Sequence, residues 1–412
     1  MLYDAYEVQR SLLAGASRMA GLGAGWISNP SNPFAYGAMG PVVAAGLDVF
    51  AHATATRAKP EWEITETLVD GHHVAVDEDI VERRPFGNLL HFHKADGKGE
   101  GQAPMLIVAP MSGHFATLLR GTVKRMLPAH DVYITDWADA KTVPLTAGSF
   151  DLDNYVDYLI DFLRDIHGKT GQRPHMLAVC QPSVPAFAAT AVMGGEDDPA
   201  RPATLTMMGG PIDTREQPTA VNTLATQRPH AWFQQNVIAT VPYMYPGAGR
   251  KVYPGFLQLA GFMTMNLGSH LMSHWEMFKH LVEGDDESAD KTREFYDEYR
   301  AVADMTAEFY LQTVDVVFQR HLLPKNEFMH RGKLVDLTEI TDTALLAIEG
   351  ERDDISGLGQ TKAALKLATH LPEKMKRYYM AEGVGHYGIF HGGKWRDKIA
   401  PVVEEFVEKH RA

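Results

Sequence analysis

Cys180 is the only cysteine among the 412 residues, and its surroundings suit a thiol that performs chemistry. The apolar run HMLAV (175–179) predicts a buried strand, and QPSVPAFAATAVM (181–193) predicts a helix with prolines in its first turn. A side chain on a sharp strand-to-helix turn is exposed for nucleophilic attack, and the positive end of a helix favours a thiolate. The alternative is that Cys180 is a small buried hydrophobic residue.

A candidate acid follows the apolar run TALLAIEG (343–350), which predicts another buried strand. Asp353 lies in the turn after this run, and Asp354 is the alternative in the same turn. A carboxylate at this place could orient the imidazole of a nucleophile–base–acid triad. The other interpretation is a solvated acidic turn.

A candidate base follows the run RYYMAEG (377–383), which predicts the last strand. His386 is flanked by glycines within EGVGHYGIFHG (382–392), and these let the loop present an imidazole; His391 is the alternative. Cysteine, acid and histidine thus each follow a predicted strand, in the chain order known for such triads on parallel sheets. This order indicates acyl transfer with Cys180 as nucleophile, Asp353 as orienting acid and His386 as base.

Acyl transfer also needs two N–H groups that bind the oxyanion. We predict that one comes from Gln181, next to the nucleophile. The other is expected from the loop APMSGHFATLL (109–119), at Met111 or Ser112. Ser112 could instead cap a helix, and Ser183 is a competing nucleophile that lies inside the predicted helix rather than at the turn.

The elements that must position these residues alternate between strands and helices, which predicts a mostly parallel sheet covered on both faces. The fold class expected is therefore α/β, with the α/β-hydrolase arrangement of nucleophile turn, acid turn and histidine loop. A helix is predicted over 152–168, ending at Gly168, and another from about Lys394. The predicted strands are WEITETLVD (62–70), HHVAVDE (72–78), NLLHFHK (88–94), PMLIVAP (104–110), HDVYITDW (130–137), HMLAV (175–179), ATLTMMGG (203–210), TALLAIEG (343–350) and RYYMAEG (377–383).

Two segments lie outside this alternation. Residues 1–60 are expected to be helical and then loop-like, with NPSNP (29–33) as the break. Residues 211–335 lack a strand–helix repeat and predict a large helical cap inserted before the strand that carries the acid; 61–210 and 336–412 would form the core. The second part of the cap, 287–323, predicts an amphipathic helix or a pair of helices.

The cap is rich in methionine and aromatic residues, which could bind an apolar substrate. Alternatively, they form the core of the cap. The candidates are Trp232, Tyr243, Tyr245, Tyr253, Phe256, Phe262 and Trp275.

Composition excludes several functions. The net charge of −13 argues against nucleic acid as a partner, and one cysteine excludes a disulfide framework within the chain and a cysteine-rich metal site. The phosphate-binding pattern G-x-x-x-x-G-K-[ST] is absent, and we expect neither cofactor nor metal. Asp4 and Glu7 stand where a secretory signal would be basic, and no apolar run of about 18 residues could span a bilayer, so we expect a cytoplasmic protein without a membrane span.

The motifs MLAVCQPSVP, LLAIEGERDDISG and EGVGHYGIFHG resemble those of the intracellular poly(3-hydroxybutyrate) (PHB) depolymerases. The resemblance extends to MLYDAYE and NPFAYG near the N-terminus and so covers nearly the whole chain. It implies a cysteine hydrolase that acts on polyester granules stored in the cytoplasm, with Cys180, Asp353 and His386 as the triad. The granule surface is then the expected partner, and a homodimer is possible.

The chain is also similar to the polyhydroxyalkanoate synthases, for which VDLTEIT (335–341) is a further point of likeness. Synthases carry Gly-x-Cys-x-Gly-Gly at the nucleophile turn, whereas this chain has Ala-x-Cys-x-Pro-Ser, which favours hydrolysis. The sequence therefore predicts hydrolysis of PHB to 3-hydroxybutyrate oligomers and monomers. The alternatives are a synthase-like or coenzyme A-dependent acyltransferase and, from another class, a non-catalytic granule-coating protein.

Overall fold

A nine-stranded sheet forms the centre of the protein. The structure, a computed structural model, describes residues 2–37, 39–55, 57–265, 279, 281 and 296–411. Across the sheet the strands follow the order β1-β2-β3-β5-β4-β6-β7-β13-β14. Their bounds are β1 (Glu66–Val69), β2 (His72–Arg84), β3 (Gly87–Lys94), β4 (Ala103–Val108), β5 (His130–Trp137), β6 (His175–Val179), β7 (Thr204–Met208), β13 (Ala344–Gly350) and β14 (Lys376–Ala381).

Pairing within the sheet changes from antiparallel to parallel at β5. The pairs β1–β2, β2–β3 and β3–β5 are antiparallel. From β5 onward, every neighbouring pair through β4, β6, β7, β13 and β14 is parallel. This order, with β5 placed between β3 and β4, is that of an α/β-hydrolase sheet, and the predicted fold class is confirmed.

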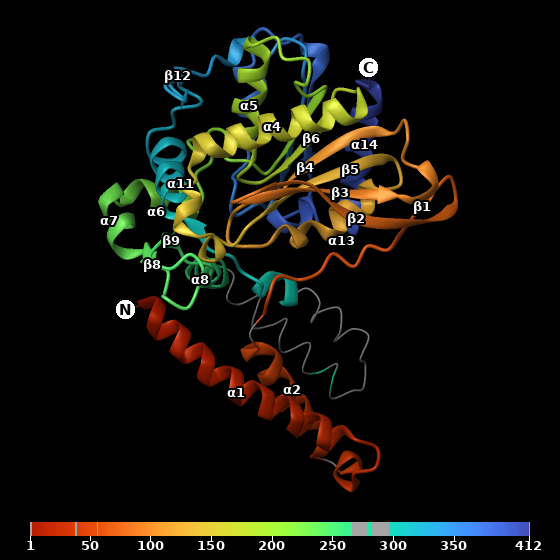
Figure 1. The fold of residues 1–412 in the computed structure, drawn as a ribbon, viewed down its shortest axis with the longest axis vertical. Coiled ribbons are helices and arrows are strands. Elements are labelled where there is room, and N and C mark those ends of the chain that lie inside the picture. Colours follow the sequence, from red (N-terminus) through yellow and green to blue (C-terminus); the bar gives the residue numbers. More distant parts are fainter. Residues whose placement is uncertain are drawn as a thin grey trace.

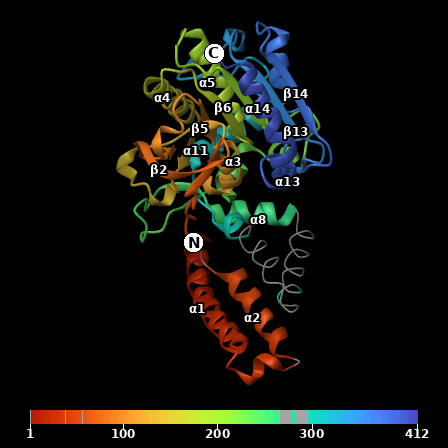
Figure 2. The ribbon, with the colours of Figure 1, turned by 90° about the vertical axis from the view of Figure 1, so that its right-hand side faces the viewer.

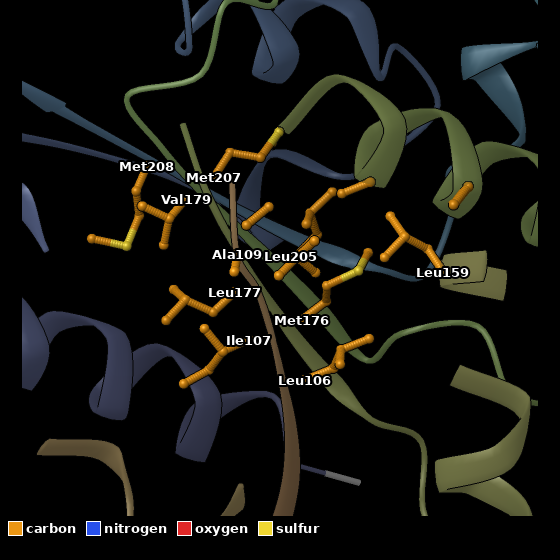
Figure 3. Packing of buried hydrophobic residues seen from close by; sticks show 14 of the residues in the cluster. Leu106, Ile107, Ala109, Leu159, Met176, Leu177, Val179, Leu205, Met207 and Met208 are labelled. Carbon is orange, nitrogen blue, oxygen red and sulfur yellow. The ribbon is translucent and has the colours of Figure 1, made fainter. Parts of the chain in front are cut away.

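The parallel strands are apolar along their length because both faces of the sheet are covered. Every residue of β4, β6, β7 and β13 is buried. Figure 3 shows how alternate side chains divide between the two faces, with Ile107 and Leu177 on one side and Met176 on the side of Leu159 from α4. The predicted and observed bounds coincide for β5 and β6.

Helices cover both faces: α4 and α5 lie on one, and α3 and α14 on the other (Figures 1 and 2). An ion pair between Arg125 of α3 and Glu404 of α14 links the second pair. The helix bounds are α1 (Leu2–Ser28), α2 (Gly40–Thr54), α3 (Arg120–Met126), α4 (Leu152–Thr170), α5 (Ser183–Gly195), α6 (Ala220–Gln227), α7 (His230–Asn236), α8 (Gly255–Met265), α11 (Ala307–Thr313), α12 (Ala363–Leu367), α13 (Gly392–Lys394) and α14 (Ala400–Lys409).

The end of α4 differs from the prediction. The helix begins at a capping box in which Asp151 accepts a hydrogen bond from the Asn154 N–H at 2.8 Å. The predicted stop at Gly168 is wrong, because the helix continues to Thr170. Gly171, with φ of 70°, supplies the left-handed conformation that ends it.

The chain leaves the sheet between β7 and β13. Its described part contains α6, α7, α8, α11 and a π-helix at Val314–Gln319, as predicted for a helical insertion. It also contains short strands that the sequence does not predict, namely β8 (Ala239–Thr240), β9 (Lys251–Tyr253), β10 (Met305–Thr306), β11 (Met329–His330) and β12 (Lys333–Leu334). Within 287–323, β10 separates a helical turn at 296–300 from α11, so the described part fits a pair of helices.

The N-terminal residues form a helical hairpin of α1 and α2 that projects away from the sheet, beneath α8 in Figure 1. NPSNP breaks the helix as predicted, but α2 replaces the predicted loop-like segment. The Ser17 hydroxyl donates to the Ala51 carbonyl at 2.7 Å, and small residues line the contact between the helices. None of the described helices combines the length and hydropathy that a bilayer crossing requires.

Candidate active site

Cys180 occupies the strand-to-helix turn between β6 and α5 in a left-handed conformation, with φ of 66°. A side chain disfavours this region of φ and ψ, so a residue other than glycine remains there only when its surroundings enforce it. Two hydrogen bonds do so here: the Cys180 N–H donates to the Met208 carbonyl at 2.7 Å, and the Ser183 N–H donates to the Cys180 carbonyl at 3.0 Å. Cys180 is half-buried and directly follows β6 at the carboxyl end of the parallel strands.

His386 and Asp353 form a buried pair beside this thiol. The His386 Nδ1 lies 2.8 Å from Asp353 Oδ2, with their side chains 4% and 0% exposed. The other carboxylate oxygen accepts hydrogen bonds from the N–H groups of Ile355 at 2.9 Å and Ser356 at 2.8 Å. With both oxygens engaged, the carboxylate is fixed and orients the ring, leaving the second ring nitrogen for the Cys180 sulfur.

The electrostatics of this pair favour a protonated histidine. Burial alone would lower the pKa of His386, but the charges of Asp353 and Cys180, with hydrogen bonds to both, raise the pKa well above its ordinary value. The rings of Tyr387 and Phe390 stand nearly perpendicular to the imidazole, at centroid distances of 5.8 and 6.0 Å. An imidazolium in this place stabilises a neighbouring thiolate.

The alternatives from the sequence lie elsewhere. Asp354 is exposed to solvent, and His391 is exposed next to α3, 3.6 Å from the position that a side chain on Gly121 would occupy. Ser183 is fully buried as the first residue of α5, and its hydroxyl has no hydrogen-bond partner among the described residues. The structure thus joins Cys180 with Asp353 and His386.

The loop after β4 reaches the same place. The Met111 N–H donates to the side-chain Oε1 of Gln181 at 3.2 Å, so an amide oxygen occupies one of the predicted oxyanion donors. The Gln181 N–H has no backbone acceptor among the described residues, and it lies directly after Cys180. Met111 is thus the member of the predicted pair Met111 and Ser112 whose N–H is seen to bind an acceptor next to Cys180, and the choice of second oxyanion donor stays a prediction.

Two glycines after β7 leave room for the close packing of the site, and sequence reasoning missed their role. A Cβ on Gly210 would lie 2.1 Å from the Ser183 hydroxyl oxygen and 3.1 Å from the Cys180 carbonyl oxygen. Gly209 has φ of 60°, and its Cβ would lie 3.2 Å from both His386 Cε1 and Asp353 Oδ2. The glycine pair in ATLTMMGG could have signalled this close approach, because glycine permits backbone to approach neighbouring groups.

The buried carboxylate of Glu349 stabilises the backbone near the triad through hydrogen bonds. Glu349, at the end of β13, accepts hydrogen bonds from the N–H groups of Gly359, Thr361 and Lys362 at 2.8–2.9 Å. The Thr361 hydroxyl in turn accepts from the Gly210 N–H at 2.8 Å. The turn that follows Asp353 is therefore tied to the strand end that supports Cys180.

The aromatic candidates of the insertion do not form one surface. Phe256 stacks on Tyr6 of α1 at 3.8 Å, and Tyr253 packs on Tyr310 at 4.1 Å; burial raises the pKa of Tyr253 to about 12. Tyr245 accepts a hydrogen bond from Arg10 at 2.9 Å. These contacts fit the alternative of internal packing. The others differ, since Trp232 is half-buried, Tyr243 is 89% exposed, and Trp275 and the side chain of Phe262 lie outside the described part of the structure.

In the described ranges, no three His, Cys, Asp or Glu side chains are grouped so that they could hold a metal ion.

The strand order and the turn at Cys180 define a protein of the α/β-hydrolase class. Residues 209–411 match the family described as PHB de-polymerase C-terminus, a range that includes Asp353 and His386 but not Cys180. Over these residues, which make up about half of the chain, the protein is similar to that family.

Solved structures provide further similarities. A putative lipase from Acinetobacter baumannii is 11% identical, with a TM-score of 0.40, covering 81% of this chain and 93% of that chain. An esterase from Thermogutta terrifontis is 13% identical, with a TM-score of 0.42, covering 87% and 100%. The comparison with curated proteins found no match.

Gly209→Ala tests the close packing behind the triad. We expect a loss of about 1–2 kcal/mol in the free energy of unfolding, because a side chain disfavours a left-handed conformation, and a fall in ester hydrolysis as His386 is displaced. Urea unfolding and kcat measure the two effects. Gly168→Ala is the control, since its Cβ meets no atom within 4 Å on α4; it should preserve activity. Unchanged stability and kcat in Gly209→Ala would show that the site tolerates the added methyl group.

Asp353→Asn tests the orienting acid. Because the Asp353 charge helps to raise the pKa of His386, we expect that pKa to fall and kcat to drop by about 10³–10⁴. The pKa is measured from the ¹³Cε1 shift of His386 across pH. Asp354→Asn serves as the control with the same change on the exposed neighbour. A larger loss in Asp354→Asn than in Asp353→Asn would reassign the acid.

Proposed function

We propose that this protein hydrolyses the ester bonds of PHB in intracellular granules to 3-hydroxybutyrate oligomers and monomers through a cysteinyl acyl-enzyme. The observation that carries this proposal is the left-handed Cys180 beside a histidine that Asp353 holds. The family match supports a polyester as the substrate. In this proposal the protein acts in the cytoplasm at the granule surface and requires no cofactor.

Acylation begins with the proton on His386 and the negative charge on the sulfur of Cys180. The sulfur attacks an ester carbonyl carbon of the polymer, and the carbonyl oxygen becomes an oxyanion. The carbon–oxygen ester bond then breaks, and the His386 imidazolium donates its proton to the departing alcohol end of the chain. The products of this step are a thioester on Cys180 and a shortened polymer.

Deacylation uses the same histidine in the opposite direction. Neutral His386 takes a proton from water, and the resulting hydroxide attacks the thioester carbonyl. The carbon–sulfur bond breaks, which releases the acid product and returns the thiolate–imidazolium pair. Asp353 holds the ring in one orientation throughout, because its Oδ2 stays bonded to Nδ1.

The N–H groups of Gln181 and Met111 are the proposed oxyanion donors. In the structure, the Gln181 amide oxygen takes the place beside Met111 that a substrate oxygen would need. A neutral amide oxygen is a weaker acceptor than an oxyanion, so the substrate can displace it as charge develops. The side chain of Gln181 thus keeps the donor hydrogen-bonded between turnovers.

Cys180→Ala should abolish release of 3-hydroxybutyrate from amorphous PHB, because the variant lacks the sulfur that forms the acyl-enzyme in this mechanism. Ser183→Ala is the matched control, as this neighbouring hydroxyl is buried and takes no part in the mechanism; its activity should stay within about twofold. Mass spectrometry of the quenched wild type should show the acyl group on Cys180. Hydrolysis that persists in Cys180→Ala would overturn the assignment.

The acceptor of the acyl group is measured in the same assay. Free acid released in equal amount with and without coenzyme A supports water as the acceptor. Formation of an acyl-coenzyme A product, absent without added coenzyme A, would establish the acyltransferase alternative.

Gln181→Glu tests the proposed oxyanion site. A carboxylate beside the Met111 N–H competes with the oxyanion through both its hydrogen bond and its charge, so we expect kcat to fall by about 10²-fold, as for loss of one donor. Gln181→Ala keeps both N–H groups free and should retain most activity. If Gln181→Ala loses as much activity as Gln181→Glu, the side chain itself is required and Met111 is not a donor.

A further inference from the structure

We infer that the hairpin of α1 and α2 is the surface by which this protein attaches to a solid, uncharged aliphatic polyester. The inference rests on the proposed function for the identity of the polymer, but it concerns a part of the chain outside the triad. It assigns attachment to the hairpin and cleavage to the α/β-hydrolase core.

The hairpin of α1 and α2 is rich in exposed large hydrophobic side chains. Most of the exposed large hydrophobic side chains among the described residues lie in it, although it is a small part of the chain. Large exposed apolar patches mark sites of interaction. The hairpin residues are Leu2, Val8, Leu12, Met19, Leu22, Trp26, Phe34, Tyr36, Met39, Val42, Val43 and Phe50.

These side chains form continuous stripes along the helices. Val8, Leu12, Met19, Leu22 and Trp26 recur at helical spacing on α1, and at 100° per residue they fall within an arc of about 80°. The face toward α2 is a different one, because Ser17, Ala20 and Ala24 are the residues buried there. The exposed stripe therefore adds a second apolar face to a helix whose first apolar face is already covered.

The second stripe is on α2, where Val43 and Phe50 are exposed one above the other, and Met39 precedes them at the start of the helix. The residues buried against α1 are Ala44 and Ala45. Both helices therefore have an apolar face that no other described element covers.

Charge is absent from the part of the hairpin around the turn between α1 and α2. Residues 19–47 contain no Asp, Glu, Lys, Arg or His, although the whole chain has a net charge of −13. The end of the hairpin at the turn between α1 and α2 lies farthest from the sheet (Figure 1). Around this turn, Trp26 and Phe34 are in contact at 6.1 Å between ring centroids, and Tyr36 is 78% exposed. This end can enter an apolar phase without desolvating a charge, which would be costly.

The base of the hairpin is joined to segments that border the active site. The Tyr3 hydroxyl donates to Asp304 at 2.6 Å, and Arg57 forms an ion pair with Asp297 at 2.6 Å. The neighbouring Ala303 N–H donates to the Gly113 carbonyl at 2.8 Å, in the loop that also carries Met111. Attachment through the hairpin would therefore tether the core that carries the oxyanion loop to the polymer.

The chemistry of the hairpin favours an uncharged surface over other occupants. Helices that lie on anionic membranes have basic polar faces, whereas α1 and α2 contain no lysine and only two arginines, of which Arg10 forms an ion pair with Glu7. A specific protein partner is usually recognised through a polar rim around an apolar centre, and residues 19–47 offer no charged rim. Two copies of a chain with a charge of −13 also repel each other.

The test compares two double variants that add the same charge. Leu22→Glu with Phe34→Glu changes the hairpin, and Leu68→Glu with Leu334→Glu changes exposed leucines elsewhere. Binding to amorphous PHB particles is measured by co-sedimentation in a Cys180→Ala background, so that hydrolysis does not alter the particles. With Cys180 present, hydrolysis of p-nitrophenyl butyrate reports whether the fold and the triad are intact.

We expect the hairpin variant to bind particles at least tenfold more weakly, and the control variant to bind as the parent does. Both should hydrolyse the soluble ester within twofold of wild type. Equal particle binding by the two variants would overturn the inference. Tighter binding to phosphatidylcholine vesicles than to PHB would also overturn it, because the surface would then be a membrane site. The same holds if the hairpin substitutions abolish a dimer of this chain but leave particle binding unchanged.

These outcomes are separate from the fate of the proposed function. If wild type releases no 3-hydroxybutyrate from PHB, the proposed function fails, but the co-sedimentation experiment still decides the role of the hairpin. If wild type does release it and the hairpin variant binds as tightly as the parent, only the attachment inference fails.

Discussion

The left-handed backbone at Cys180 is the constraint on which the site depends. A φ of 66° is unfavourable for a residue with a side chain, by roughly 1–2 kcal/mol. The neighbouring strand β7 enforces it, because the Met208 carbonyl accepts the Cys180 N–H and Gly210 leaves room for the start of α5. The densely packed strands around β6 therefore stabilise a conformation that places the thiol beyond the end of the sheet.

The same edge of the sheet brings the partners of the thiol together. The strands β4, β6, β7, β13 and β14 are parallel, so the turns at their carboxyl ends meet at one edge, as ligand and catalytic groups do in open α/β sheets. Asp353 is fixed there by two backbone N–H groups, and Glu349 fixes the turn that follows it. The carboxylate of Asp353 orients the imidazole of His386, and that of Glu349 holds the backbone of the turn after Asp353. The two acidic residues therefore have different roles although they lie only a few positions apart in the sequence.

The parts that the sequence predicts well are those governed by local pattern. Apolar runs such as HMLAV are long enough to define β6, and the order of cysteine, acid and histidine follows from where such runs end. The roles of Gly209 and Gly210 could not be predicted in this way, because they depend on the approach of Ser183 and His386 from distant parts of the chain. The amide oxygen of Gln181 on the Met111 N–H is a choice of side-chain rotamer, which residue type does not reveal.

Aromatic residues show a different limit of sequence reasoning. Composition identifies the insertion as the apolar, aromatic segment, yet Tyr253 and Phe256 are packed against α11 and α1. Most of the exposed large hydrophobic side chains of the described residues lie instead in the hairpin, where alanines and glycines between the helices leave the larger side chains to face solvent. A helix with small residues on its inner face and large ones on its outer face gains little from folding alone. Such an arrangement is stabilised when the outer face contacts an apolar phase. The proposed substrate is insoluble in water, so its surface would supply such a phase for the outer faces of α1 and α2.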